Sequence, residues 1–297
     1  MKKAPIPVHF LAVAAAIFWG MSFIWSSVLL RYYEPVTIIL FRLILSTLFL
    51  SAVCFISGTF LRLRRADLKW FLLSSLCNPF LYFLGETYGL KLTSSIHTAV
   101  IIATTPVFSP LAGFLAYRER LRWFNFLGIL ISFAGITIIL MTRGFRLAIP
   151  VSGILCLAGA VISALFYSVI LKKLTVRYPP VQIIAVQNGI GSIFFLPLFL
   201  ALDLQNGLSL PATTEVITSF LCLSILASSL AFVFYTTAIR TLGISKTNIF
   251  SNLIPVFTAI FSFVMLGEEL TLRKIAGMAV VVAGVYLSEV SWKGKRR

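Results

Sequence analysis

Residues 103–121 read ATTPVFSPLAGFLAYRERL, and residues 252–270 read NLIPVFTAIFSFVMLGEEL. In each stretch a Pro-Val-Phe triplet interrupts an apolar run that ends in a glutamate. A shift of 149 residues aligns ten identical pairs over residues 98–138 without a gap: Thr98/Thr247, Pro106/Pro255, Val107/Val256, Phe108/Phe257, Phe114/Phe263, Glu119/Glu268, Leu121/Leu270, Gly128/Gly277, Ala134/Ala283 and Gly135/Gly284. Shared apolar composition alone does not align proline, glutamate and glycine together, so we interpret the chain as an internal repeat.

The composition is typical of a membrane protein. Of the 297 residues, 59% are hydrophobic and 11% are charged, whereas a soluble domain is about 45–50% apolar and about 25% charged. The net charge of +16 would suggest nucleic acid in a soluble chain. Because the Lys and Arg residues lie in short connections between apolar runs, we expect no nucleic-acid partner and, instead, contact with anionic lipid.

A transmembrane helix needs about 20 mainly apolar residues. Ten runs meet this requirement: 8–30, 36–57, 69–90, 95–117, 123–142, 151–171, 181–202, 216–239, 247–266 and 273–291. If the N-terminus is cytoplasmic, 18 of the 25 Lys and Arg residues fall inside the cell, 6 fall outside, and Arg42 lies within a span. Positive residues concentrate on the cytoplasmic side. We therefore predict a multi-pass protein of the bacterial inner membrane with both termini in the cytoplasm.

The repeat divides the ten spans into two groups of five. The first group occupies residues 1–146 and the second residues 147–297. Because five is odd, the second group must enter the membrane from the opposite side. The predicted fold is an all-α integral membrane protein with ten transmembrane helices arranged as two inverted five-helix repeats, a plan common among secondary transporters.

Residues 85–140, GETYGLKLTSSIHTAVIIATTPVFSPLAGFLAYRERLRWFNFLGILISFAGITIIL, resemble the EamA family of the drug/metabolite transporter superfamily. The pattern is the end of span 3, a Ser/Thr-Ala entry to span 4, a central Pro-Val-Phe, a Glu-Arg-Leu and then glycines; it recurs in 235–287. The resemblance covers essentially the whole chain and implies a ten-helix carrier, usually an exporter of metabolites or amino acids. This chain departs from the family pattern at Glu86, where the residue is usually uncharged, and at Pro110.

Pro106 and Pro255 lie near the middle of spans 4 and 9. Each removes a backbone donor and frees the carbonyl four residues earlier, which in a membrane must bond within the protein or face a water-filled cavity. A packing kink is one interpretation for either proline. The symmetric pair favours a hinge beside a cavity, with three polar residues available to a substrate: Thr104, Thr105 and Asn252.

Arg42 and Glu86 are charged residues within predicted spans, both in the outer half of the membrane. An unpaired charge at such a depth is costly. Glu86 could bind a cation or carry a proton, and Arg42 could bind a carboxylate or form a gate. The alternatives are a structural Arg42–Glu86 pair, or side chains that extend to the interface. The second half has Gln187 and Tyr235 at the corresponding positions, so neither charge is repeated.

In proteins that this chain resembles, spans 1, 3, 4, 6, 8 and 9 line a central cavity. Aromatic faces there would suit apolar or cationic substrates, although belt or core packing is the ordinary role of any single aromatic residue. The further cavity candidates on these spans are Trp19, Ser22, Tyr82, Tyr167, Ser228 and Tyr235.

Two other repeated features are interpreted as structural. Glu119 and Glu268 would tie the turns after spans 4 and 9 to nearby basic residues, Arg122 or Lys274. The glycine pairs Gly128/Gly135 and Gly277/Gly284 are each spaced by seven residues, which places small residues on one stripe and permits close helix contact. The sequence leaves open whether that contact lies within a monomer or at the seam of a homodimer.

Catalytic and cofactor signals are absent from the sequence. The cysteines form no CxxC motif, the two histidines are isolated, and no phosphate-binding G-x-x-x-x-G-K-[ST] loop occurs. We expect no enzyme activity, no metal and no cofactor. A membrane enzyme would need clustered Asp, Glu or His within the spans, and a non-transporting scaffold would not need the repeat.

The main hypothesis is a secondary carrier that works by alternating access, by proton coupling or facilitated diffusion. It would export a small molecule such as an amino acid or amphipathic amine. The alternative within the same architecture is an uptake carrier or exchanger of a nucleotide-like or phosphorylated solute. That substrate would require several cations in the cavity, and Arg42 is the one candidate in the spans.

Overall fold

The structure, a computed structural model, describes residues 6–105, 107–108, 123–140, 149–204, 213–242, 247 and 250–289. Within these ranges every regular element is helical and no strand occurs. Pro106, Pro110 and Glu119 lie outside the described residues, so the interpretations of them remain predictions.

The described helices are distributed over both halves of the chain. The first half contains α1 (Ile6–Leu29), α2 (Pro35–Ile56), α3 (Arg65–Ser75), the π-helical η1 (Leu76–Leu81), α4 (Tyr82–Leu92), α5 (Ser95–Ile102) and α7 (Trp123–Leu140). The second half contains α8 (Val151–Thr175), α9 (Pro180–Leu202), α11 (Thr214–Leu221), η2 (Cys222–Leu230), α12 (Ala231–Leu242), α14 (Ile254–Phe261), η3 (Ser262–Leu266) and α15 (Leu272–Glu289).

Five helical runs in the described part of the chain are long and apolar enough to cross a membrane. They are Val8–Leu29, Pro35–Ile56, Val151–Thr175, Pro180–Leu202 and Thr214–Leu242, and shorter apolar helices occupy Phe126–Leu140 and Ile254–Leu266. For the described residues this confirms an all-α fold with several helices long and apolar enough to span a membrane. The count of ten spans remains a prediction.

Local sequence explains where several helices begin. Pro35 and Pro180 occupy the first turns of α2 and α9, where the missing N–H has no helical partner and the fixed φ suits a helix. The Thr213 hydroxyl accepts from Val216 N at 3.3 Å and caps α11. After η3, Gly267 takes a left-handed φ of 67°, a conformation that glycine adopts without steric cost.

Three helical runs are broken within the described residues. Asn78 has φ −142° and ψ 117° inside η1, next to Pro79. Residues 103–104 form a turn after α5, and residues 252–253 form a turn before α14. These last two turns are related by the shift of 149 residues. Pro255 therefore lies in the first turn of α14 and does not interrupt a continuous helix.

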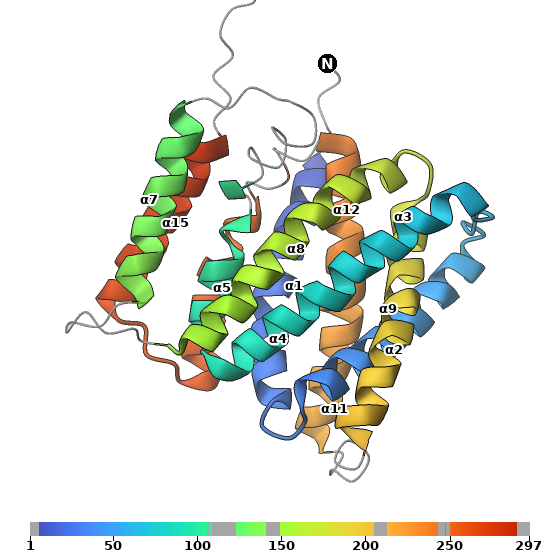
Figure 1. Cartoon of the computed structure of the whole chain (residues 1–297), viewed down its shortest axis with the longest axis horizontal. Coiled ribbons are helices and arrows are strands. Elements are labelled where there is room, and N and C mark those ends of the chain that lie inside the picture. The colour runs from blue at the N-terminus through green and yellow to red at the C-terminus, as the bar shows by residue number, and fades with distance from the viewer. Residues whose placement is uncertain are drawn as a thin grey trace, which may run out of the picture.

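Each first-half helix packs against a partner from the second half. The main pairs are α1 with α12, α2 with α9, α4 with α8, α5 with α14, and α7 with α15. Figure 1 shows α7 and α15 side by side at one edge of the bundle, with α4 and α8 crossing its face. The two halves thus build one interleaved bundle.

The glycine stripes meet within the chain, at the contact between α7 and α15. A Cβ atom added to Gly135 would lie 2.7 Å from Val281 N and 2.9 Å from the Gly277 carbonyl oxygen. Gly284 likewise approaches the backbone of Ser132 and the Gly128 carbonyl. Of the two possibilities that the sequence left open, the structure shows contact within the monomer.

Polar contacts join the two halves at both ends of the α2–α9 pair. At the start of α2, Asp203 Oδ2 accepts from Thr37 N at 3.0 Å and from Thr37 Oγ1 at 2.9 Å. At the other end, Gln182 pairs with the backbone N–H and carbonyl of Leu61.

A third cross-half contact involves Asp67, which precedes the apolar part of the α3–α4 run. Asp67 Oδ2 accepts from Arg177 Nη1 at 2.6 Å and from the Tyr178 hydroxyl at 2.8 Å. The hydrogen bond from Arg177, supported by that from Tyr178, holds the pKa of the Asp67 carboxyl below its usual value.

Glu268 does not have the partner that the sequence suggested. Its Oε1 accepts from Ser95 N at 3.0 Å, so it satisfies an N–H group in the first turn of α5. Lys274 instead donates to the Glu269 carbonyl. The interpretation of Glu268 as a tie within its own turn was wrong, because the α5 N-terminus, remote in sequence, lies within hydrogen-bonding distance.

Candidate functional site

A cavity of about 120 Å³ lies where helices of both halves meet. The helices α1, α2, α4, α8 and α12 contribute side chains to it, together with η1 and the chain around the breaks at 103–104 and 252–253. Its lining is mainly aromatic and aliphatic, with a few polar groups. This composition is typical of sites for small organic molecules.

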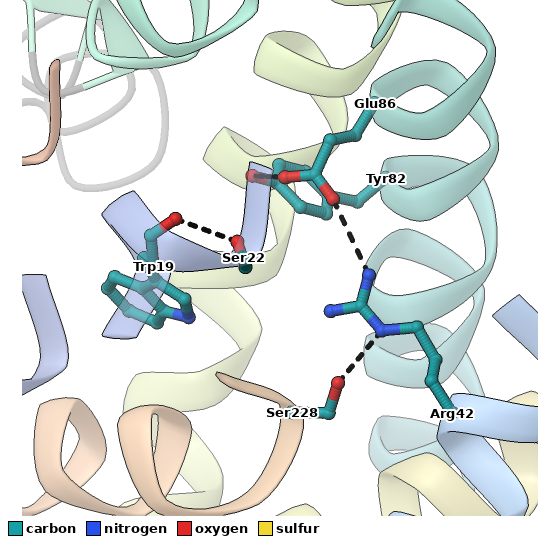
Figure 2. Close-up of polar contacts among 6 residues, drawn as sticks. All are labelled: Trp19, Ser22, Arg42, Tyr82, Glu86 and Ser228. Carbon is teal, nitrogen blue, oxygen red and sulfur yellow. Dashed lines mark hydrogen bonds and ion pairs between the residues drawn. The ribbon is translucent and has the colours of Figure 1, made fainter. Parts of the chain in front are cut away.

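The buried charges of this cavity are Arg42 and Glu86, which are 2% and 8% exposed. Arg42 Nη1 lies 3.9 Å from Glu86 Oε2. The two side chains therefore form an ion pair inside the protein and do not extend to a membrane interface. Figure 2 shows the guanidinium between Glu86 on one side and Ser228 on the other.

Neighbouring side chains hold each charge in place. Arg42 Nε donates to Ser228 Oγ at 2.8 Å, and its Cζ lies 4.0 Å from the ring centroid of Phe83. The Tyr82 hydroxyl donates to Glu86 Oε1 at 2.8 Å from one turn earlier on the same helix. Such fixed partners reduce the cost of burying charge and give both groups defined directions.

Ser228 is itself held by the packing of η2 against α2 and α9. Asn188 Nδ2 donates to the Ser228 carbonyl at 3.1 Å and to Ser46 Oγ at 2.7 Å. The hydroxyls of Ser46 and Ser229 lie 2.6 Å apart. This network fixes the backbone that presents the Ser228 hydroxyl to Arg42.

Three aromatic residues, Trp19, Phe232 and Tyr235, form an aromatic wall of the cavity. The Trp19 ring centroid lies 5.0 Å from that of Tyr235 and 5.1 Å from that of Phe232, both in edge-to-face geometry. Tyr167 donates to Gln187 Oε1 at 3.3 Å on a neighbouring side. The cavity thus combines one charged patch with a broad apolar surface.

Most of the side chains proposed from the sequence come together here. Those that line the cavity are Trp19, Ser22, Arg42, Tyr82, Glu86, Thr105, Tyr167 and Tyr235. Ser228 is not part of the cavity lining, but its hydroxyl accepts a hydrogen bond from Arg42. These residues come from both halves of the chain, so the site exists only in the folded bundle.

Thr104 and Asn252 do not line the cavity. The Thr104 hydroxyl donates to the Ile101 carbonyl, and the side chain is buried. Asn252 is also buried, and its Oδ1 has no hydrogen-bond partner among the described residues. Both belong to the turns that break their helices. Closeness in sequence to Pro106 or Pro255 is therefore not sufficient to place a side chain in the cavity, although Thr105 does line it.

The sequence interpretation missed other lining residues, among them Asn78, Phe83, Ser168 and Ser251. Asn78 had a usable signal, since Asn-Pro within an apolar run marks a break in regular structure. Phe83 had none, because its stacking on Arg42 depends on the packing of α4 against α2.

The family model described as the EamA-like transporter family matches residues 6–141 and, separately, residues 151–290. An uncharacterized transporter of Archaeoglobus fulgidus is 27% identical over 287 residues, covering 94% of this chain and 96% of the relative. The uncharacterized transporter YvbV of Bacillus subtilis is 27% identical over 299 residues, covering 100% and 96%.

A probable terminal-alkyne amino-acid exporter of Streptantibioticus cattleyicolor is 28% identical over 199 residues, which cover 67% of this chain and 65% of that protein. A solved crystal structure aligns with a TM-score of 0.72 over 96% of each chain at 16% identity. At this identity the structural likeness shows a shared fold.

Proposed function

Because the chain belongs to the EamA-like transporter family, it is a multi-pass membrane transporter of a small molecule, and we propose that it is a secondary carrier working by alternating access. The proposed direction is export, and the proposed cargo is a small metabolite such as an amino acid or amphipathic amine. The exporter name of the Streptantibioticus cattleyicolor relative supports this choice. The proposed location is the bacterial inner membrane, with both termini in the cytoplasm.

The observation that carries the proposal is the central cavity with its buried Arg42–Glu86 pair. Intramembrane ionisable residues are costly and commonly mark a substrate or ion pathway. The cavity lies among helices of both halves, which is where inverted-repeat carriers place their substrate.

The proposed architecture is ten spans in two inverted repeats, residues 1–146 and 147–297. Support comes from the separate family matches to 6–141 and 151–290, and from the helix pairs. A two-fold axis in the membrane plane would exchange the α1–α12 pair with the α4–α8 pair. It would map the α2–α9, α5–α14 and α7–α15 pairs onto themselves.

Pro106 and Pro255 are proposed as hinges. The helix breaks at 103–104 and 252–253 support this role, since they occupy repeat-related positions beside the cavity. Thr105 Oγ1 donates to the Ile102 carbonyl at 2.7 Å, which is the carbonyl that a proline at position 106 would leave without a helical donor. A break satisfied in this way can bend without burying an unpaired group.

A nucleotide-like or phosphorylated substrate is the weaker alternative. Such a ligand would require several cationic partners, and among the described residues of the cavity lining Arg42 is the one basic side chain. Proton coupling through Glu86 also belongs to the proposal and is tested by the pH dependence of transport. The protein is proposed to be a monomer or a homodimer.

The test is a comparison of metabolites released into the medium by cells that overexpress the protein and by cells that lack its gene. A third strain expresses the Arg42→Ala/Glu86→Ala variant at the same level, which controls for the effects of overproducing a membrane protein. We expect at least one small metabolite to accumulate outside the overexpressing cells alone. Identical media from all three strains would contradict export.

A further inference from the structure

The guanidinium of Arg42 is bound on two sides and open on the third. Nε donates to Ser228, and Phe83 covers one face. Among the described residues, Nε is the only nitrogen of this group that donates a hydrogen bond, because the 3.9 Å from Nη1 to Glu86 Oε2 is beyond hydrogen-bonding distance. The Nη groups of a residue that is 2% exposed therefore border the cavity without a close acceptor.

Glu86 is incompletely paired in a complementary way. Its Oε1 accepts from Tyr82, whereas the described contact of Oε2 is the long one with Arg42. A carboxylate oxygen can accept more than one hydrogen bond. The cavity thus holds a positive group that lacks acceptors beside a negative group that lacks donors.

The charge balance of this pair selects among ligands. A ligand with only an ammonium group would compete with Arg42 for Glu86 and leave the buried guanidinium without compensation. A ligand with only a carboxylate would do the same to Glu86. Leaving one buried charge uncompensated is strongly unfavourable. A ligand with both charges pairs with each group and keeps the site neutral.

We propose that the cavity binds a zwitterion, with its carboxylate on the Nη groups of Arg42 and its ammonium on Glu86 Oε2. This inference rests on the proposed transport function and narrows its cargo from amino acids or amines in general to molecules that carry both charges close together. In an α-amino acid the two charged groups are attached to one carbon, so they can contact two neighbouring partners at once. The apolar part of the ligand lies against the wall of Trp19, Phe232 and Tyr235.

The test uses three probes that share one branched alkyl group. Leucine carries both charges, 3-methylbutylamine carries only the ammonium, and 4-methylpentanoate carries only the carboxylate. Binding to the purified full-length protein in lipid nanodiscs is measured by titration of tryptophan fluorescence and by the shift in Tm. We expect leucine to bind with at least about tenfold higher affinity than either of the other two, since each loses a charged hydrogen bond.

Charge variants make the expectation sharper. Glu86→Gln leaves Arg42 as a net positive charge, so 4-methylpentanoate becomes the preferred probe. Arg42→Gln reverses the preference toward 3-methylbutylamine. Asp67→Asn removes a carboxylate whose partners, Arg177 and Tyr178, lie outside the cavity lining, and it leaves the order of the three probes unchanged. If Arg42→Gln does not fold, Glu86→Gln alone decides.

The outcomes separate this inference from the transport proposal. Equal binding of the three probes, stronger binding of 3-methylbutylamine than of leucine, no binding of any probe, or an unchanged order in Glu86→Gln overturns the zwitterion site. Leucine binding without counterflow in proteoliposomes overturns the transport proposal and leaves the zwitterion site in place. Counterflow of 3-methylbutylamine without leucine counterflow overturns the zwitterion site and leaves the transport proposal in place.

Discussion

At the scale of single residues, the site depends on a few hydrogen bonds to charged groups. Ser228 is the described hydrogen-bond partner of the Arg42 guanidinium, and Tyr82 is that of the Glu86 carboxylate. Both partners are uncharged, so they orient the charges without neutralising them. Removing either partner leaves a buried charge less well satisfied, which costs more than losing a bond at the surface.

Ser228→Ala tests this dependence. We expect a loss of about 1–3 kcal/mol in stability, because Arg42 Nε is left buried without its acceptor, together with weaker transport of the cargo. The measurement is the Tm in detergent, with transport followed in proteoliposomes. Ser168→Ala is the matched control, since Ser168 also lines the cavity but donates only to Leu165 of its own helix. Equal effects of the two variants would refute the role given to Ser228.

At the scale of helices, a helix end and a close helix contact depend on groups from the other half of the chain. The N-terminus of α5 receives Glu268 from the segment after η3. The α7–α15 contact brings two glycine stripes against each other's backbones. In both places a helix is contacted by a segment that is remote in sequence.

Glu268→Ala is expected to lower stability by about 0.5–2 kcal/mol, the usual cost of losing a side-chain cap at a helix N-terminus. The change is read from the Tm of the purified protein. The adjacent variant Glu269→Ala should have little effect. Glu269 is exposed, and Lys274 donates to its backbone carbonyl, which an alanine retains. A larger effect at Glu269 than at Glu268 would contradict the capping role.

Gly135→Ala is expected to cost about 1–3 kcal/mol, since the new methyl group must displace α15 from its contact with α7. Gly159→Ala serves as the control: nothing lies within 4 Å of an added Cβ at this exposed position of α8, so the change should be neutral or slightly stabilising. Thermal unfolding of both variants in the same detergent makes the comparison. Wild-type stability of Gly135→Ala would show that the contact tolerates separation.

At the scale of the whole molecule, the two halves cannot be separated without dismantling the site. Arg42 and Glu86 come from the first half, and Ser228 and Tyr235 come from the second. The halves are similar in sequence but not in the cavity, where Gln187 and Tyr235 stand at the positions related to Arg42 and Glu86. In the proposed mechanism the symmetry therefore concerns motion, whereas both charged residues of the cavity lining come from the first half.

The predicted topology places Arg62 in the cytoplasm and Thr214 outside. Each is replaced by cysteine in a variant whose four native cysteines have been substituted, and both positions are exposed. An impermeant maleimide added to intact cells should label Thr214→Cys, and it should label Arg62→Cys only after permeabilisation. The reverse pattern would invert the orientation, and labelling of both in intact cells would rule out the ten-span arrangement.

Much of the candidate site could be predicted from the sequence. Ionisable residues are unusual in apolar spans, and this identified Arg42 and Glu86. The resemblance to the EamA family indicated which spans line a cavity. Thr104 and Asn252 were misplaced and Phe83 was missed, because the direction of a side chain beside a break and its contact with another helix depend on packing.

The sequence by itself determined the class of the protein, since apolar composition and the repeat are properties of the chain that need no folding to be read. Only the tertiary structure decided that Glu268 caps α5, that the glycine stripes meet within the monomer, and that Ser228 holds Arg42 beside Glu86. The physical reason is that these contacts join residues more than a hundred positions apart. Hydropathy and spacing are local quantities, whereas the partner of a buried group is chosen by how whole helices pack.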